Sequence, residues 1–135
     1  MYVFVITLIC FGAMSILDYF HGEVDIQFFF EWAGLLILAH ALAPPPILAL
    51  GVTIVAGLVG FVLLYAGAWA EGDAFAFLLL GYAFPNWIFL LNLLIIAVVL
   101  ANVVLVARFL LRGELRLSTA LFPYLFVGWL AAFLL

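Results

Sequence analysis

Residues 70–85 read AEGDAFAFLLLGYAFP: two carboxylates flank one glycine, and the apolar run that follows ends at a proline. A helix from Asp73 to Phe84 is about 18 Å long at 1.5 Å per residue, whereas the hydrocarbon core of a bilayer is about 30 Å thick. The run is therefore too short to cross a membrane from side to side. The stretch predicts a short helix that follows a glycine-containing turn and, with Pro85 near the outer surface, places Asp73 well inside the membrane.

The rest of the chain is strongly apolar. Of its 135 residues, 73% are hydrophobic and only 7% are charged, far from the roughly 45–50% apolar content of soluble domains. The alternating pattern of membrane barrel strands is missing, and a backbone in lipid must satisfy its own hydrogen bonds, so the segments must be helices. Polar and proline-rich breaks separate six apolar segments, at roughly 2–17, 27–43, 46–69, 74–84, 87–111 and 117–135.

These segments predict the fold class. We expect an all-α integral membrane protein, with residues 1–135 as a single transmembrane domain. The domain is a compact bundle of about six transmembrane helices, with a short fourth helix after the AEGD turn. Because Cys10 is the only cysteine, the sequence offers no disulfide framework and no thiolate metal cluster.

The charged residues are confined to one side of the predicted bundle. In a six-span chain the first, third and fifth connections lie on the same side. All three basic residues surround the end of the fifth segment: Arg108, Arg112 and Arg116. The positive-inside rule makes this side cytoplasmic and puts both termini outside. Five acidic residues fall in or beside the other two connections on that side: Asp18, Glu23, Asp25, Glu71 and Asp73. This acidic mouth should attract a cationic partner.

Two of these acids are candidates for chemistry. Asp18 ends the first span, where the helix dipole makes a carboxylate mildly unfavourable, so capping does not explain it. Asp73 opens a helical run, and N-capping is a sound structural explanation for it. Its predicted depth favours a functional role instead, because ionisable residues inside a membrane mark functional sites. Two adjacent carboxyls share one proton, so that one activates water while the other donates to a carbonyl oxygen, as in aspartic proteases.

The placement of these residues resembles a known family. Asp18 is followed six and seven positions on by Val24 and Asp25, and a Gly72–Asp73 pair opens the short fourth segment. This pattern resembles the type IV prepilin peptidase family of GxGD aspartyl proteases, and it is closest to the small archaeal preflagellin and prepilin peptidases. The resemblance covers nearly the whole chain, although its sharp motifs are two aspartates, one glycine and their spacing.

The resemblance implies a function. Asp18 and Asp73 become the catalytic pair, and Gly72 permits a tight active-site turn that also contains Glu71. The substrate is the precursor of a type IV pilin or archaellin, cut at the cytoplasmic membrane face between its short basic leader and its hydrophobic helix. Neither a metal nor another cofactor is implied, and the expected partners are this precursor and membrane lipid, not nucleic acid. The candidates for binding the leader are Glu23, Asp25 and Glu71, although charges solvated in loops are the simpler explanation.

The sequence departs from the family pattern at four positions. Ala70 replaces the first glycine of GxGD, and Phe20 and Gly22 stand where members commonly carry basic residues. Phe75 stands where a lysine is frequent. These changes leave the aspartate pair intact and bear on efficiency and substrate class.

Other functions stay open at this point. Paired intramembrane acids also form proton relays, so a proton-coupled transporter or relay subunit is one alternative. A structural membrane protein, or a homologue that binds leaders without cutting them, is another. His21 and His40 fall on opposite sides of the predicted bundle, so one zinc site cannot use both. The four tryptophans are expected mainly as anchors at the membrane interface: Trp32, Trp69, Trp87 and Trp129.

Overall fold

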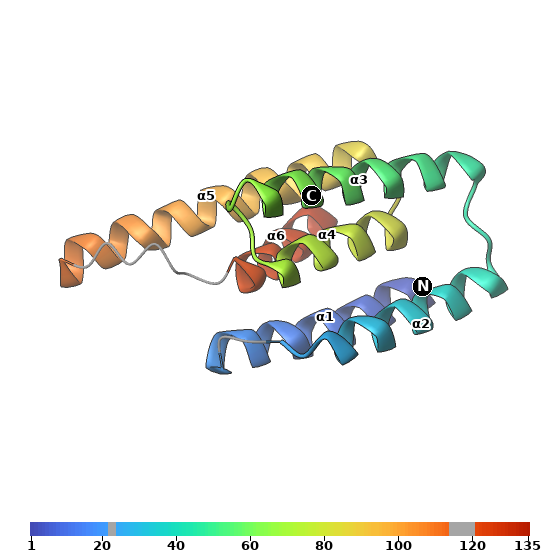
Figure 1. The fold of residues 1–135 in the computed structure, drawn as a ribbon, viewed down its shortest axis with the longest axis horizontal. Coiled ribbons are helices and arrows are strands. Elements are labelled where there is room, and N and C mark those ends of the chain that lie inside the picture. The colour runs from blue at the N-terminus through green and yellow to red at the C-terminus, as the bar shows by residue number, and fades with distance from the viewer. Residues whose placement is uncertain (22–23, 114–120) are drawn as a thin grey trace.

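The structure of the protein is a computed structural model that describes residues 1–21, 24–113 and 121–135. Within these ranges the chain forms only helices (Figure 1), as the sequence predicts. They are α1 (Tyr2–His21), α2 (Ile26–Leu42), α3 (Ile47–Tyr65), α4 (Glu71–Ala83), α5 (Trp87–Arg112) and α6 (Phe122–Leu134). Three of them, α1, α3 and α5, are long and apolar enough to cross a membrane, and the shorter α2 and α6 are also apolar.

Consecutive helices pair as antiparallel hairpins. Figure 1 shows α1 beside α2, α3 beside α4, and α5 beside α6. The short helices α4 and α6, of 13 residues each, lie between the α1–α2 hairpin and the long helices α3 and α5. Helix α4 contacts α1, α2, α3 and α6, which makes it the central helix of the bundle. The prediction of a short fourth helix is confirmed.

The connection before α4 differs from the prediction. Helix α3 ends at Tyr65, and Gly67 follows with a left-handed φ of 73°. The N–H of Ala68 donates to the carbonyl of Leu63, and the N–H of Gly67 donates to that of Leu64. This is a Schellman motif, which requires a residue without a Cβ penalty at positive φ. The third apolar segment is therefore a helix of ordinary length followed by a turn.

The AEGD stretch itself is not a turn. Glu71 and Gly72 belong to the first turn of α4, where every residue has negative φ. The prediction that Gly72 permits the tight turn is wrong, because Gly67 supplies the left-handed residue and leaves Gly72 free to be helical. The helix starts three residues earlier than the apolar pattern indicates, since charged residues are well accommodated in a first turn.

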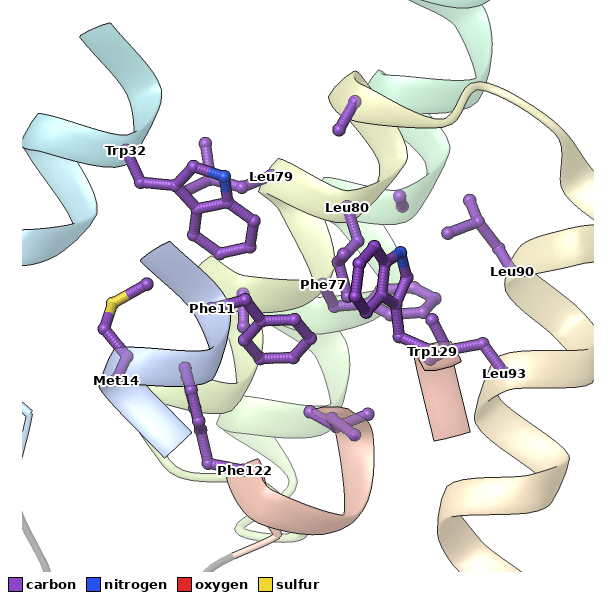
Figure 2. Packing of buried hydrophobic residues seen from close by; sticks show 14 of the residues in the cluster. Phe11, Met14, Trp32, Phe77, Leu79, Leu80, Leu90, Leu93, Phe122 and Trp129 are labelled. Carbon is purple, nitrogen blue, oxygen red and sulfur yellow. The ribbon is translucent and has the colours of Figure 1, made fainter. Parts of the chain in front are cut away.

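Aromatic rings fill the centre of the bundle (Figure 2). Phe11 of α1 stacks on Trp32 of α2, with ring centroids 5.3 Å apart. Trp32 and Trp129 are fully buried, and Trp69 is 9% exposed. The expectation that the tryptophans are interfacial anchors is therefore wrong for these three, because they pack against other rings inside the bundle. Only Trp87, at the start of α5, is exposed.

Small residues allow close helix approach at α5–α6. A Cβ placed on Gly128 would lie 2.8 Å from the carbonyl oxygen of Leu93 and 3.1 Å from the amide nitrogen of Ala97. Both neighbours are backbone atoms of α5, so they cannot yield as a flexible side chain does. Glycine at this position lets the two backbones pack directly, as is common between helices in membranes.

The first prediction concerns this contact. Gly128→Ala should lower the free energy of unfolding by about 1–3 kcal/mol, the usual cost of overpacking a close contact. Loss of helical circular dichroism during SDS titration in detergent micelles measures it. Gly34→Ala is the matched control, because a Cβ there meets nothing within 4 Å and alanine favours the helix. Equal stability of the two variants would contradict the prediction.

Candidate active site

Asp18 lies on the buried face of α1. This face also carries Thr7, Phe11, Met14 and Ser15, which recur at helical spacing. The helix continues to His21, so Asp18 lies about one turn before the helix end rather than closing it. Its side chain is 9% exposed, and within the described ranges its Oδ2 atom has no hydrogen-bond partner. A buried carboxyl oxygen without a partner is costly for structure alone.

Asp73 is the third residue of α4 and is 5% exposed. Its Oδ2 accepts a hydrogen bond of 3.1 Å from the N–H of Ala70, the N-cap residue. The alanine side chain has no acceptor, so only this half of a capping box is present. Helix capping thus accounts for one oxygen of Asp73. The sequence is compatible with Asp73 as the N-cap, whereas here the residue caps from the third helical position.

The fold brings the two aspartates together. Helices α1 and α4 pack against each other, and both carboxyls are buried on these neighbouring helices. Repulsion between two such carboxyls favours a state in which the pair carries a single proton. A singly protonated pair holds both a proton acceptor and a proton donor.

Aromatic rings pack against the backbone beside Asp73, which the sequence did not predict. A Cβ on Gly72 would lie 3.6 Å from Cζ of Phe29 and 3.8 Å from Cδ2 of Phe122. Phe29 comes from α2 and Phe122 from the start of α6, and both are buried. No local pattern distinguishes them among 15 phenylalanines, because their role depends on which helices become neighbours.

Other acids lie at the same end of the bundle. Glu71 is exposed at the start of α4. Asp25 is exposed and is the N-cap of α2, where its side chain accepts from the N–H of Gln27 at 3.1 Å. Glu23 and Arg116 lie outside the described residues. Arg108 and Arg112 are exposed at the end of α5.

The two histidines lie in different surroundings. His40 is buried near the opposite end of α2, with its ring 4.5 Å from that of Tyr82, while His21 is exposed at the end of α1. In the part of the chain that the structure describes, no three His, Cys, Asp or Glu side chains come together as metal ligands do. Phe20 and Phe75, two of the departures from the family pattern, are exposed.

No protein-family model, curated protein or solved structure matches this chain.

Proposed function

We propose that the protein is an intramembrane-type aspartyl endopeptidase of the type IV prepilin peptidase kind. The observation that carries this proposal is a pair of buried carboxyls on two helices that pack against each other, Asp18 from α1 and Asp73 from α4. They are distant in sequence, and capping accounts for only one oxygen of Asp73. An unpartnered buried carboxyl beside a second one is expensive to maintain, and aspartic protease chemistry is a recurrent reason to maintain it.

In the proposed reaction the pair begins with one proton. The ionised carboxyl removes a proton from water, and the oxygen of that water attacks the carbonyl carbon of the scissile peptide bond. The protonated carboxyl donates its proton to the carbonyl oxygen. Return of a proton to the amide nitrogen then allows the C–N bond to break, which yields a new carboxyl terminus and a new amino terminus. The two side chains supply every proton transfer, so this chemistry uses no cofactor.

The position of the two aspartates relative to the length of α5 supports a site below the membrane surface. A Cβ on Gly81 of α4 would lie 3.7 Å from Cδ1 of Leu90 on α5, which puts these two residues at one level. From Gly81 back to Asp73 is about 12 Å of helix, and the same distance along α5 leads from Leu90 to about Val98. Helix α5 continues beyond this level as far as Arg112. In Figure 1 the last turns of α5 project beyond the other helices at the left of the view.

The proposed substrate follows from this depth and from the charges. If the arginines at the end of α5 mark the cytoplasmic interface, the aspartate pair acts on a peptide bond near the start of a membrane-embedded helix. The exposed carboxylates of Asp25 and Glu71 lie at the same end and suit a basic leader. A pilin or archaellin precursor has this arrangement. We therefore place the active site on the cytoplasmic side of a multi-pass bundle in the cell membrane.

The second prediction concerns these two carboxylates. Replacement of both, Asp25→Asn with Glu71→Gln, should raise KM for a basic-leader precursor by about 2- to 5-fold per carboxylate at low salt, the usual range for exposed ion pairs. Asparagine keeps the N-cap of α2. The difference should shrink at high salt because the charges are screened. A precursor with a neutral leader is the control, and an equal rise in its KM would contradict leader binding.

The experiment that tests the function is co-expression with a tagged pilin or archaellin precursor in a host without its own leader peptidase. Leader removal is followed by gel shift, and the new amino terminus is identified by mass spectrometry. We expect cleavage at one bond between the leader and the apolar helix. Intact precursor beside folded, membrane-inserted protein, over a panel of precursors, would reject the proposal.

One observation favours a second candidate, a proton relay. Buried polar atoms without a hydrogen-bond partner among the described residues also occur away from the aspartates, at Thr7 Oγ1 and His40 Nδ1. A relay needs such groups at several depths, in addition to the acid pair. Dissipation of a pH gradient across proteoliposomes, lost in His40→Phe, would identify this function. A peptidase alone predicts no such leak.

A further inference from the structure

Phe122 occupies a special position between the two helices that carry the aspartates. It is the first residue of α6 and is 2% exposed. On one side its ring meets Phe11 of α1 edge to face, with centroids 5.1 Å apart; Figure 2 shows the two rings as neighbours. On the other side its Cδ2 lies 3.8 Å from the place of a Cβ on Gly72, the residue before Asp73. One ring thus meets an aromatic ring of α1 and lies beside the first turn of α4.

Phe29 of α2 supports this ring. Its centroid is 5.9 Å from that of Phe122, at an angle of 77°, and its Cζ is 3.6 Å from the Gly72 position. Phe29 is 5% exposed. The two rings meet edge to face, which is a favoured aromatic geometry. Phe122 is therefore held in place by α1, α2 and α4 together.

Because helices move as rigid units, the position of the Phe122 ring affects where the two carboxyls lie. Phe11 and Asp18 are on the same buried face of α1, about two turns apart. Gly72 and Asp73 are adjacent in the first turn of α4. We therefore expect a change in the space that the Phe122 ring occupies between α1 and α4 to change the separation of the two aspartates. Because packed interiors have few voids, the loss of a ring is followed by movement of its neighbours.

We propose that Phe122 is a positioning residue that sets the separation between Asp18 and Asp73. The proposal rests on the function proposed above and adds to it the side chain that keeps the two aspartates at their working separation. Phe122 acts through the backbone of α4 and through Phe11 of α1, and it is not a catalytic residue.

The kinetic test compares Phe122→Ala with Phe126→Ala, both assayed on a precursor that the wild-type protein cleaves. Phe126 lies one turn further along α6 and also meets Phe11, at 5.3 Å, but unlike Phe122 it is not among the nearest neighbours of a Cβ placed on Gly72. We expect Phe122→Ala to lower kcat by about 10- to 100-fold, the effect of misplacing catalytic groups by about 1 Å, with KM within about 2-fold. Phe122→Met, which keeps most of the volume, should recover most of kcat. Equal effects of the two alanine variants, or a change in KM alone, would overturn the proposal.

A second measurement is independent of activity. In a Cys10→Ser background, Asp18→Cys and Asp73→Cys provide a pair of thiols for a short bifunctional thiol reagent. Phe122→Ala should change the rate of cross-linking by about 5-fold or more, whereas Phe126→Ala should leave it within about 2-fold. An unchanged rate in Phe122→Ala would overturn the positioning role even where the peptidase assay succeeds. Absent cleavage by the wild type, together with a changed rate, would reject the peptidase function and keep the positioning role.

Discussion

Asp18→Asn and Asp73→Asn should each reduce precursor cleavage on the order of 10³-fold or more while the protein still folds. Asparagine has nearly the shape of aspartate but cannot hold or release the catalytic proton, and groups that act as a unit lose most of their effect when one member is removed. In Asp73→Asn the amide oxygen can still accept from the N–H of Ala70, so the start of α4 keeps its hydrogen bond. Initial cleavage rates in detergent micelles, normalised to folded protein, give the result.

The controls distinguish the loss of a catalytic aspartate from the loss of any negative charge. Glu31→Gln removes an exposed carboxylate from α2, where it accepts from the Gln27 side chain at 3.2 Å, and should leave the rate within about 2-fold. The double variant of Asp18 and Asp73 should be no slower than either single variant, because both residues serve one proton-sharing unit. Normal processing by either single variant would end the aspartyl mechanism.

Gly81→Ala should lower the free energy of unfolding by about 1–3 kcal/mol. A Cβ at this position of α4 would lie only 2.6 Å from Cβ of Ala56 on α3, which is too close for two carbon atoms. Since the clash is with a single methyl group, its removal should relieve the strain. Ala56→Gly should therefore destabilise the wild type by about 1 kcal/mol but leave Gly81→Ala unchanged or more stable. SDS titration of the four proteins gives the coupling energy.

Gly72→Ala provides the matched comparison on the same helix. A Cβ there meets Phe29 and Phe122 only at ordinary contact distances of 3.6 and 3.8 Å. The variant should be as stable as the wild type, or more stable by about 0.5–1 kcal/mol, because alanine favours a helix over glycine. Strong destabilisation by Gly72→Ala, or additive effects in the Ala56 and Gly81 cycle, would contradict the close packing described for α4.

The sequence predicted the helices well where long apolar runs meet strong breaks. The ends of α5 follow from Asn86, whose side chain accepts from the N–H groups of Ile88 and Phe89, and from Gly113 with a left-handed φ of 67°. Such signals act within a few residues and are visible in the sequence.

Prediction failed where two local explanations competed. Gly67 and Gly72 both stand near the break between α3 and α4, and only one of them takes positive φ. The choice depends on where α3 ends, which its packing against α4 determines. The prediction for the tryptophans was wrong for a related reason. A tryptophan suits either an interface or a core, and the residues that bury Trp32 and Trp129 come from other helices.

By itself the sequence determined an all-helical chain, a fourth helix too short to cross a membrane, and two acidic residues in apolar surroundings. These properties depend on composition and on spacing within one segment, where backbone hydrogen bonding and helical periodicity are local. The tertiary structure alone decided that Asp18 and Asp73 are buried on helices that pack against each other and that Phe122 lies between these helices. Contacts between helices depend on how ridges and small residues fit together, and that fit is a property of surfaces that only the folded bundle brings into contact.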